Sequence, residues 1–308
     1  RLGWVCELPL QDYTPLSGPL PTAGSDRVTV RWPQRYEWAE SARWVESIKR
    51  GLAMHVAVVA EEIGQPHTGV VALQIELDGQ RLDVMIDYSD DVELNQPALE
   101  NAGVYFKMQY LAAGYGDTRV VPGGYVPNAD TLYSLLPRVR GYRDLRRFSY
   151  DVHGRFSPGY AASTRAQAVS LLRDSALRYE GWLRHVRYGA FLREIARSRV
   201  CIDLPGRGPF CFRLVDYLAV GSCIVAVRHP TVLNRPLVEN EHIVYVHDDL
   251  SDLVDLCRRL VEDDDRRERL ATSAREFFDR HLTPRQLGAY YAHTCLRVLA
   301  PAELTTTT

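Results

Sequence analysis

The second half of the chain alternates short apolar runs with longer amphipathic segments, and this alternation limits the possible folds more than any other feature. The short runs predict strands at 148–153, 200–204, 223–227 and 243–246. Apolar residues at helical spacing predict helices at 164–173, 188–197, 210–220, 250–262, 266–280 and 285–300. Strands that alternate with helices of this length form βαβ units, so we expect a doubly wound parallel sheet.

The first half of the chain is less regular. After an irregular lead-in over 1–26, the patterns predict a helix at 38–52 and strands at 28–32, 55–60 and 103–110. The runs 70–77 and 82–88 predict a β-hairpin, because the Asp78-Gly79 pair between them suits a tight turn.

The boundary between the two halves is expected where periodicity is lost. Residues 128–147 are mostly Arg, Leu, Tyr and Pro without a clean period. We therefore place the domain junction there, with an N-terminal domain over 1–145 and a C-terminal domain over 146–308.

Ser163 or Thr164 is expected to cap the helix predicted at 164–173.

Charge and cysteine usage narrow the class of protein. There are 37 Lys and Arg against 39 Asp and Glu, a net charge of −2, which argues against a general nucleic-acid partner. No apolar stretch approaches the roughly 20 residues that span a bilayer. None of the six cysteines forms a C-x-x-C pair, which predicts reduced thiols in a cytoplasmic protein. Histidines and cysteines lack metal-ligand spacing, so we expect no metal.

The stretch from 200 to 230 runs strand, glycine-rich loop, helix and strand. The loop contains Gly206, Arg207 and Gly208. In a doubly wound sheet such a loop lies at the carboxyl ends of the strands, where ligands bind. Glycines let backbone N–H groups approach a ligand, and the N-terminus of the following helix favours an anion.

Two charged residues follow this loop on the expected helix. Arg213 and Asp216 are three residues apart and should share a face. The spacing suits a diphosphate held by the loop and Arg213, with ribose hydroxyls bonded by Asp216. The alternative is a tight strand–helix turn with a surface Arg–Asp pair, and the residues alone leave both possibilities open.

The segments RVCIDLPG (199–206) and FRLVDYLAVGSCIV (212–225) resemble the donor-binding domain of GT-B glycosyltransferases, most closely the exostosin-like group. The resemblance covers about residues 148–299. It implies an α/β GT-B fold in which two Rossmann-like domains face one another across a cleft. The C-terminal domain would bind a nucleotide-diphosphate sugar, with Arg155 and Arg165 near its phosphates, and the N-terminal domain would bind the acceptor. In many such folds the last helix crosses back to the first domain.

The chain departs from the family pattern in two places. Many retaining enzymes of this fold carry two Glu residues at this loop, whereas this chain has Gly208 and Asp216 in those places. The Arg-plus-Lys pair common on another loop has no Lys available in the second half. Both departures leave the stereochemical outcome open.

In the first half, an apolar run leads into a turn that contains Asp87, Asp90 and Asp91. An acceptor hydroxyl needs a base, and a carboxylate can serve if burial raises its pKa. Asp90 is the preferred base and Asp87 the other catalytic candidate. Exostosin-like bacterial enzymes carry a comparable acidic turn before a segment like 104–107, which places Asp91 and Lys107 on the acceptor side. The alternatives are a capping cluster or the metal-binding acids of GT-A transferases.

These patterns predict a hexosyl- or pentosyltransferase whose co-substrate is a nucleotide-diphosphate sugar and which needs no further cofactor. A nucleotide-sugar epimerase of the same fold and a non-catalytic carbohydrate- or nucleotide-binding module are the alternatives. His229 follows a strand and could reach the donor, although a plain loop histidine explains it as well. Trp182 and Tyr188 could stack on a nucleobase or pack in the core.

Overall fold

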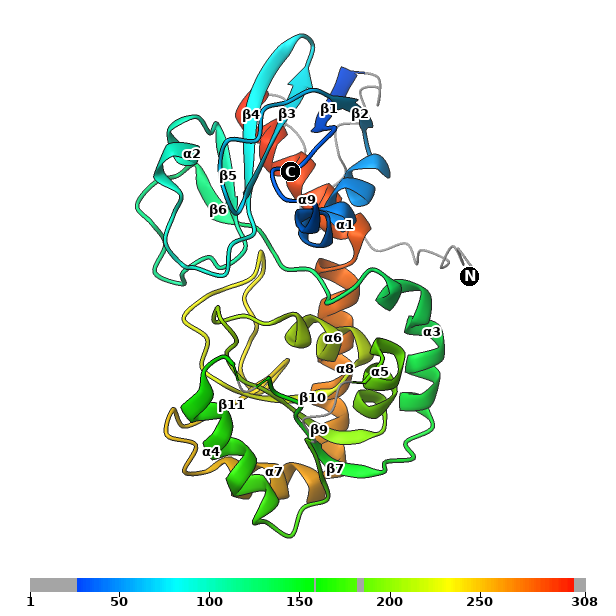
Figure 1. The fold of residues 1–308 in the computed structure, drawn as a ribbon. Coiled ribbons are helices and arrows are strands. Elements are labelled where there is room, and N and C mark those ends of the chain that lie inside the picture. Colours follow the sequence, from blue (N-terminus) through cyan, green and yellow to red (C-terminus); the bar gives the residue numbers. More distant parts are fainter. Residues whose placement is uncertain (1–26, 158, 182–185, 302–308) are drawn as a thin grey trace. The chain divides into compact units, whose positions relative to one another are not determined.

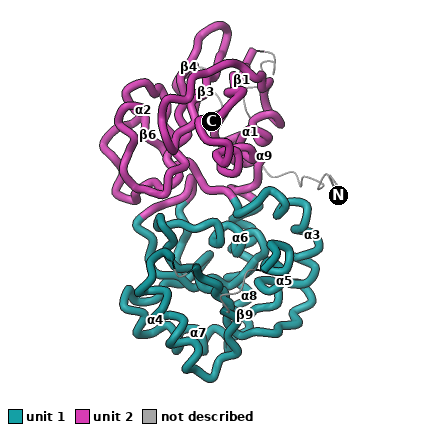
Figure 2. Tube along the Cα trace, viewed as in Figure 1, with its two compact units in different colours: residues 1–10, 127–230, 236–279 teal, residues 11–126, 231–235, 280–308 magenta. Residues whose placement is uncertain are grey.

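The computed structural model describes residues 27–157, 159–181 and 186–301 (Figure 1). The expectations for 1–26 and for Trp182 lie outside the described residues. The chain divides into two compact units (Figure 2). Unit 1 contains residues 127–230 and 236–279, and the described part of unit 2 contains residues 27–126, 231–235 and 280–301.

Unit 1 is built on a sheet whose strands are all parallel, in the order β11-β10-β9-β7-β8. The strands are β7 (Tyr150–His153), β8 (Tyr179–Glu180), β9 (Ser198–Asp203), β10 (Cys223–Val227) and β11 (Val244–Val246). Because the strands run in one direction, their carboxyl ends all lie at one edge of the sheet. The expectation of a doubly wound parallel sheet is confirmed for this unit.

Helices cover both faces of this sheet. α4 and α7 contact one another on one face, and α3, α5 and α6 contact one another on the other (Figure 1). The helices of unit 1 are α3 (Thr131–Asp144), α4 (Ala162–Arg173), α5 (Tyr188–Ala196), α6 (Phe212–Val220), α7 (Leu253–Glu262) and α8 (Asp264–His281), whose last two residues fall in unit 2.

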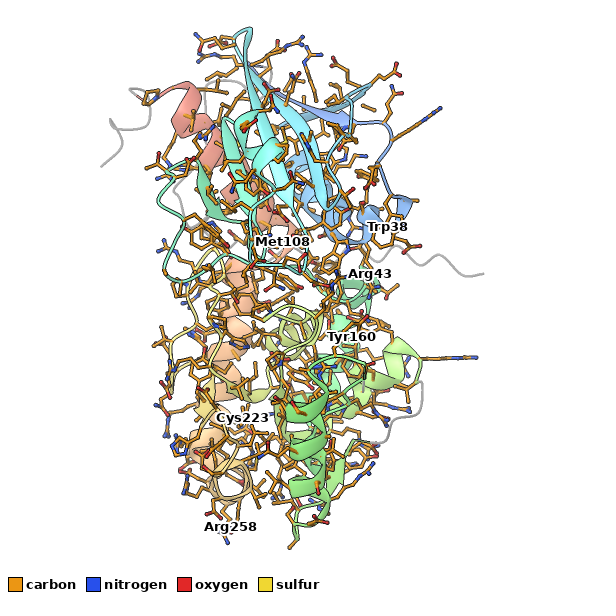
Figure 3. The ribbon with its side chains drawn as sticks, turned by 60° about the vertical axis from the view of Figure 1, so that its left-hand side comes forward. Trp38, Arg43, Met108, Tyr160, Cys223 and Arg258 are labelled. Carbon is orange, nitrogen blue, oxygen red and sulfur yellow. The ribbon has the colours of Figure 1, made fainter. Side chains whose placement is uncertain are left out.

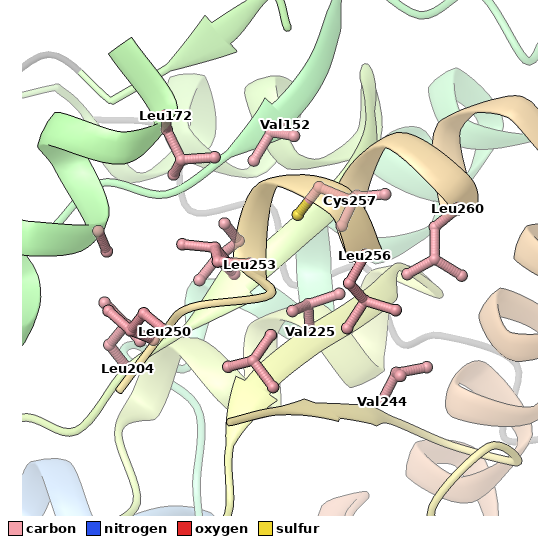
Figure 4. Packing of buried hydrophobic residues seen from close by; sticks show 14 of the residues in the cluster. Val152, Leu172, Leu204, Val225, Val244, Leu250, Leu253, Leu256, Cys257 and Leu260 are labelled. Atoms are coloured by element: carbon pink, nitrogen blue, oxygen red, sulfur yellow. The ribbon is translucent and has the colours of Figure 1, made fainter. Parts of the chain in front are cut away.

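The core under α7 follows from helical spacing. Its buried residues recur at intervals of three and four, which places them on one face of the helix: Leu253, Leu256, Cys257 and Leu260. This face packs onto Val225, Val244 and Val152 of the sheet and Leu172 of α4 (Figure 4). Arg258, on the opposite face of α7, is exposed, whereas Cys223 is buried within the sheet (Figure 3).

Unit 2 has a mixed sheet in the order β2-β1-β3-β4-β5-β6. Its strands are β1 (Val28–Pro33), β2 (Ala57–Glu61), β3 (Val70–Leu77), β4 (Gln80–Asp87), β5 (Val104–Lys107) and β6 (Val120–Pro122). β3 pairs antiparallel with both β1 and β4, while the other pairs are parallel. The predicted hairpin is confirmed, and both turn residues, Asp78 and Gly79, have positive φ. The α/β class therefore holds for both units, although this sheet is not wholly parallel.

Helices from the two ends of the chain cover one face of the unit 2 sheet. They are α1 (Ala42–Ala53), which follows a short 3-10 turn (Ala39–Ser41), and α9 (Pro284–Leu299). Phe106 of β5 stacks on Tyr291 of α9 with ring centroids 3.8 Å apart. The neighbouring Tyr105 points to the opposite face, which α2 (Gln96–Glu100) helps to cover. The last helix thus belongs to the same compact unit as the first half of the chain, as the resemblance implied.

α1 and α9 cross at two glycines. A Cβ added to Gly288 would lie 2.0 Å from the carbonyl carbon of Gly51, and a Cβ added to Gly51 would lie 1.8 Å from the carbonyl oxygen of Pro284. Both positions are helical, so the backbone conformation itself would accept any residue. The requirement for glycine comes from the closeness of the two helix backbones.

Several expectations from the sequence were wrong or incomplete. Residues 128–147 are largely helical, because they contain α3. The predicted junction between residues 145 and 146 directly follows this helix. Pro137 lies inside this helix, which removes one backbone donor and hides the helical pattern. α4 has Ala161 at its N-cap position with no side-chain cap, so neither Ser163 nor Thr164 caps it. α2, β6 and β8 were not predicted, because each is very short.

We expect Gly288→Ala to lower the free energy of unfolding by roughly 1–3 kcal/mol. The clash with the α1 backbone should outweigh the gain in helix propensity of about 1 kcal/mol. Gly141→Ala on α3 is the matched control, because a Cβ there meets no atom within 4 Å, and it should stabilise the protein by about 0.5–1 kcal/mol. Urea unfolding followed by circular dichroism measures both. An unchanged or higher stability of Gly288→Ala would contradict the close helix crossing.

Candidate donor-binding site

Polar and charged residues end three neighbouring strands of the unit 1 sheet, β9, β7 and β8. His153 ends β7, Glu180 ends β8 and Asp203 ends β9, and all three are buried. Because the strands are parallel, these side chains come to the same edge of the sheet, where open α/β sheets bind their ligands. A charged side chain that is buried at this edge needs a hydrogen-bond or ion-pair partner. These partners make up the candidate donor-binding site.

The β9–α6 loop lies at this edge. The backbone N–H of Gly206 donates to the carbonyl oxygen of Gly208 at 2.9 Å, which closes a tight turn. A Cβ at residue 206 would lie 2.7 Å from Sγ of Cys211, so a larger residue would displace the loop. Gly208 is buried and Arg207 is exposed. In the described part of the chain, the side chain of the N-cap residue Cys211 makes no capping hydrogen bond to the first turn of α6, and the positive end of a helix dipole favours an anion.

Arg213 lies in the first turn of α6 and is largely buried. Its Nη1 is 3.4 Å from Oδ1 of Asp203, and its guanidinium lies 4.9 Å from the ring centroid of Phe156. Burial acts to lower the pKa of the Arg213 guanidinium, but the neighbouring Tyr217 and Asp203 raise it by a larger amount. The net shift of the pKa is therefore upward, and the side chain stays charged. Arg213 therefore pairs with the end of β9, and the alternative of a surface Arg–Asp pair is wrong, because Asp216 is buried.

Asp203 also contacts a histidine that enters from the next strand. Nε2 of His229, which follows β10, lies 3.3 Å from Oδ2 of Asp203. The imidazole is buried beside Phe210, with ring centroids 4.9 Å apart. Asp203 is thus flanked by Arg213 on one oxygen and His229 on the other. Asp203 was not predicted as a site residue, although its place as the last residue of β9 before the glycine-rich loop is a signal that could have indicated it.

Arg165 of α4 joins two loops at the same edge. Its Nε donates to the carbonyl oxygen of Pro205 and its Nη1 to that of Ser157, both at 2.8 Å. Nη2 lies 3.8 Å from Sγ of Cys211. The side chain is almost fully buried, and burial lowers its pKa. Arg165 therefore brings positive charge directly beside the loop that contains Gly206.

Arg155 is held by two carboxylates. Its Nε donates to Glu194 and its Nη2 to Glu180, both at 2.7 Å. Burial alone would raise the pKa of Glu194, but its contacts with His153 and Arg155 hold that pKa to about 2. His153 is fully buried, which lowers its own pKa. Arg155 is thus engaged in a buried charge cluster, an arrangement that the sequence did not indicate.

Asp216 and Tyr188 form a buried pair. Tyr188, the first residue of α5, donates its hydroxyl to Oδ1 of Asp216 at 2.5 Å. Asp216 has no exposed surface. Burial and the nearby Asp216 carboxylate raise the pKa of the Tyr188 hydroxyl, so it remains a donor. The pair accounts for Tyr188 without a stacked nucleobase.

The acidic turn of unit 2 contains residues with very different surroundings. Asp87 is buried, and its Oδ2 accepts hydrogen bonds from Nζ of Lys107 at 2.9 Å and from the Tyr105 hydroxyl at 2.5 Å. Its Oδ1 accepts from both the backbone N–H and the hydroxyl of Ser89. Lys107 has no exposed surface. Asp87 and Lys107, partners in the β4–β5 register, therefore tie the ends of these strands together.

The other two acids of this turn are more accessible. Asp90 is half-buried and Asp91 is exposed. Neither caps the following helix, because Asn95 is the N-cap residue of α2 and accepts from the backbone N–H of Ala98. The capping alternative for the Asp cluster is therefore wrong.

Two further findings concern the described residues only. None of their helices combines the length and apolarity needed to cross a bilayer. Nor do they bring three His, Cys, Asp or Glu side chains close enough together to hold a metal ion.

A family model described as glycosyl transferase-like matches residues 138–291, which is half of the chain. The chain belongs to this glycosyl transferase-like family. The matched region contains the parallel sheet of unit 1, the β9–α6 loop and the residues around Asp203. The expected resemblance to GT-B glycosyltransferases is thereby confirmed at the level of the family.

Similarities to solved structures are more distant. A sucrose-phosphate synthase from Thermosynechococcus elongatus is 16% identical, with a TM-score of 0.38, and the alignment covers 61% of this chain and 54% of that one. A glycosyltransferase from Rickettsia africae is 12% identical, with a TM-score of 0.33 and coverage of 58% and 45%. The chain thus spans about half the length of either structure, and their activities do not carry over to it. No curated protein matches the sequence.

We expect Lys107→Met to lower the free energy of unfolding by about 3–5 kcal/mol, because it leaves the Asp87 carboxylate buried without its cation. Lys49→Met is the matched control. Lys49 is partly exposed and lies 3.7 Å from Glu46, so its loss should cost less than about 1 kcal/mol. Urea unfolding compares the two lysine variants. Equal stabilities would show that the Asp87–Lys107 pair does not hold the strand ends together.

Proposed function

We propose that the protein transfers a sugar from a nucleotide-diphosphate sugar to an acceptor and that unit 1 binds the diphosphate at the β9–α6 loop. The observation that carries this proposal is the position of two arginines, the buried Arg165 beside the loop of Gly206 and the largely buried Arg213 in the first turn of α6. Backbone N–H groups and guanidinium groups are the donors that phosphate oxygens require. Family membership supports the sugar-transfer chemistry.

The charges at this edge suit a departing diphosphate. As the sugar–oxygen bond breaks, negative charge grows on the leaving phosphate, and fixed donors that already point at it stabilise the transition state. Arg213 is held in place by Asp203 and by the face of Phe156, so little reorganisation is needed. In this proposal the positive charge comes from Arg213, Arg165 and the helix N-terminus.

The remaining candidates take different parts in this proposal. Arg207 is exposed and free to swing onto a bound diphosphate. Arg155 and Asp216 act as positioning residues, since Arg155 is clamped by glutamates and Asp216 holds Tyr188. His229 contacts Asp203 and lines the same edge.

For the acceptor we propose Asp90 as the base. Asp87 is fully engaged with Lys107, Tyr105 and Ser89, and it serves as the anchor of the turn. Asp90 follows this anchored segment and retains partial exposure, which a base needs in order to reach an acceptor hydroxyl. The exposed Asp91 would contribute negative charge to the acceptor side.

Arg213→Ala should weaken the binding of nucleoside diphosphates by about 10- to 150-fold, which corresponds to the roughly 1.5–3 kcal/mol of a charged hydrogen bond. Arg258→Ala is the matched control, because Arg258 is an exposed arginine on α7, and it should leave affinity unchanged. Isothermal titration calorimetry with a set of nucleoside diphosphates measures both. An Arg213→Ala protein that is folded and binds them all with unaltered affinity would refute the proposed donor site.

Asp90→Asn should reduce turnover by about 100-fold or more while donor affinity is kept, because the amide cannot accept the acceptor proton. Asp83→Asn, an exposed position on β4, is the control and should keep normal turnover. Nucleotide release in the presence of candidate acceptors measures turnover, and calorimetry measures donor affinity. Nearly normal turnover of Asp90→Asn would assign the turn a structural role only.

A further inference from the structure

The loop that follows β7 and the loop that follows β9 lie at a change of side in the unit 1 sheet. β7 and β9 are neighbouring strands. α4, which follows β7, lies on one face of the sheet, and α6, which follows β9, lies on the other (Figure 1). Open α/β sheets bind their ligands at such a switch point, between the two loops. A donor bound at the β9–α6 loop would therefore also meet the β7–α4 loop (154–161).

The β7–α4 loop contacts both arginines that are proposed to bind the diphosphate. The ring centroid of Phe156 lies 4.9 Å from the guanidinium of Arg213 and 5.8 Å from that of Arg165. The carbonyl oxygen of Ser157 accepts from Nη1 of Arg165, whose Nε donates to Pro205 of the other loop. The two loops are thus joined at the place where the phosphates would lie.

Tyr160 is the aromatic residue of this loop that solvent reaches. It is 50% exposed, whereas Phe156 is 3% exposed (Figure 3). Within the described part of the chain, Tyr160 makes no hydrogen bond and its ring packs on no other ring. It is three positions after Ser157, so the Cα atoms of the two residues lie within about 11 Å of one another. The ring is therefore both available and close to the proposed phosphate donors.

The backbone on both sides of Tyr160 is fixed by Arg165. Ala161 has φ 42° and ψ 46°, a left-handed conformation that is uncommon for a residue with a Cβ. Its carbonyl oxygen accepts from the backbone N–H of Arg165 at 3.0 Å, while the side chain of Arg165 holds Ser157. Strained backbone of this kind gathers at ligand sites. A ring whose backbone is already ordered also loses less freedom when a ligand binds.

Other aromatic side chains of unit 1 are less available. Tyr188 is half-buried and donates its hydroxyl to Asp216, and Phe210 is buried. Trp182 lies outside the described residues. Of the aromatic residues of unit 1 that the structure describes, Tyr160 alone is exposed.

We propose that Tyr160 stacks on the nucleobase of the donor, an inference that rests on the proposed diphosphate site. A nucleobase is a flat π-system, and an aromatic side chain binds it face to face. Every base has such a face, so this contact holds the nucleoside without selecting which base it carries. Arg213 would then set the affinity for the diphosphate, and Tyr160 would set the affinity for the nucleoside attached to it.

The test is calorimetric titration of the intact protein with uridine, guanosine and adenosine diphosphate and with inorganic pyrophosphate, which lacks the nucleoside. Tyr160→Ala should weaken the tightest nucleoside diphosphate by about 5- to 150-fold, the scale of one base stacked on an aromatic ring, and leave pyrophosphate unchanged. Tyr160→Phe should keep nearly full affinity, because stacking needs the ring and not the hydroxyl. Tyr142→Ala, which changes a half-buried tyrosine of α3, is the matched control and should alter neither ligand.

Two further variants separate stacking from other contacts. Tyr160→Leu keeps an apolar side chain but removes the flat ring, so it should bind nucleoside diphosphate as weakly as Tyr160→Ala does. Arg213→Ala should weaken nucleoside diphosphate and pyrophosphate alike. The inference is overturned if Tyr160→Ala binds nucleoside diphosphate normally, if it weakens pyrophosphate equally, or if Tyr160→Leu keeps full affinity. If the unaltered protein binds neither kind of ligand, the proposed donor site itself fails, and the role of Tyr160 fails with it.

Discussion

The carboxylate of Asp203 has no exposed surface, and the partners that compensate for its burial lie at the carboxyl edge of the unit 1 sheet. Burying an ionised carboxylate costs several kcal/mol of folding free energy unless hydrogen-bond donors or cations replace its hydration. Arg213 reaches it from α6 and His229 reaches it from the segment after β10. Both partners are thereby fixed beside the glycine-rich loop, where a cation and a polar ring can meet a ligand.

Unit 2 uses a buried carboxylate at a strand end in a different way. Oxygens of Asp87 accept hydrogen bonds of 2.5–2.9 Å from Lys107, Tyr105 and Ser89. The contacts of Asp203 are longer, at 3.3 and 3.4 Å, beyond the usual hydrogen-bond range. Asp87 is thus a structural anchor with short hydrogen bonds, whereas Asp203 holds Arg213 and His229 through longer contacts.

Much of the fold could be predicted because it depends on local patterns. The alternation of apolar runs and helices in the second half predicted the parallel sheet of unit 1, and Asp78-Gly79 predicted the hairpin. α3 was missed because Pro137 interrupts its pattern, and its stability comes from buried residues such as Leu132 and Leu136. Burial of this kind depends on contacts distant in sequence, which a local pattern does not contain.

The site could be predicted only in part, for the same reason. Sequence spacing places the glycine-rich loop and Arg213 at one edge of the sheet, and the structure bears out that placement. Spacing along a helix does not reveal which strand end a side chain meets. The sequence therefore did not predict that Arg213 pairs with Asp203, or that Arg155 pairs with Glu180 and Glu194.

The central claim is that a nucleoside diphosphate binds at the β9–α6 loop of unit 1. Amide hydrogen–deuterium exchange of the intact protein, with and without saturating uridine, guanosine or adenosine diphosphate, tests it most directly. At least one of these nucleotides should slow exchange in residues 204–216, because the loop and the first turn of α6 would donate N–H groups to the phosphates. Exchange in this segment that no nucleotide changes, with protection appearing only elsewhere in the chain, would contradict the account.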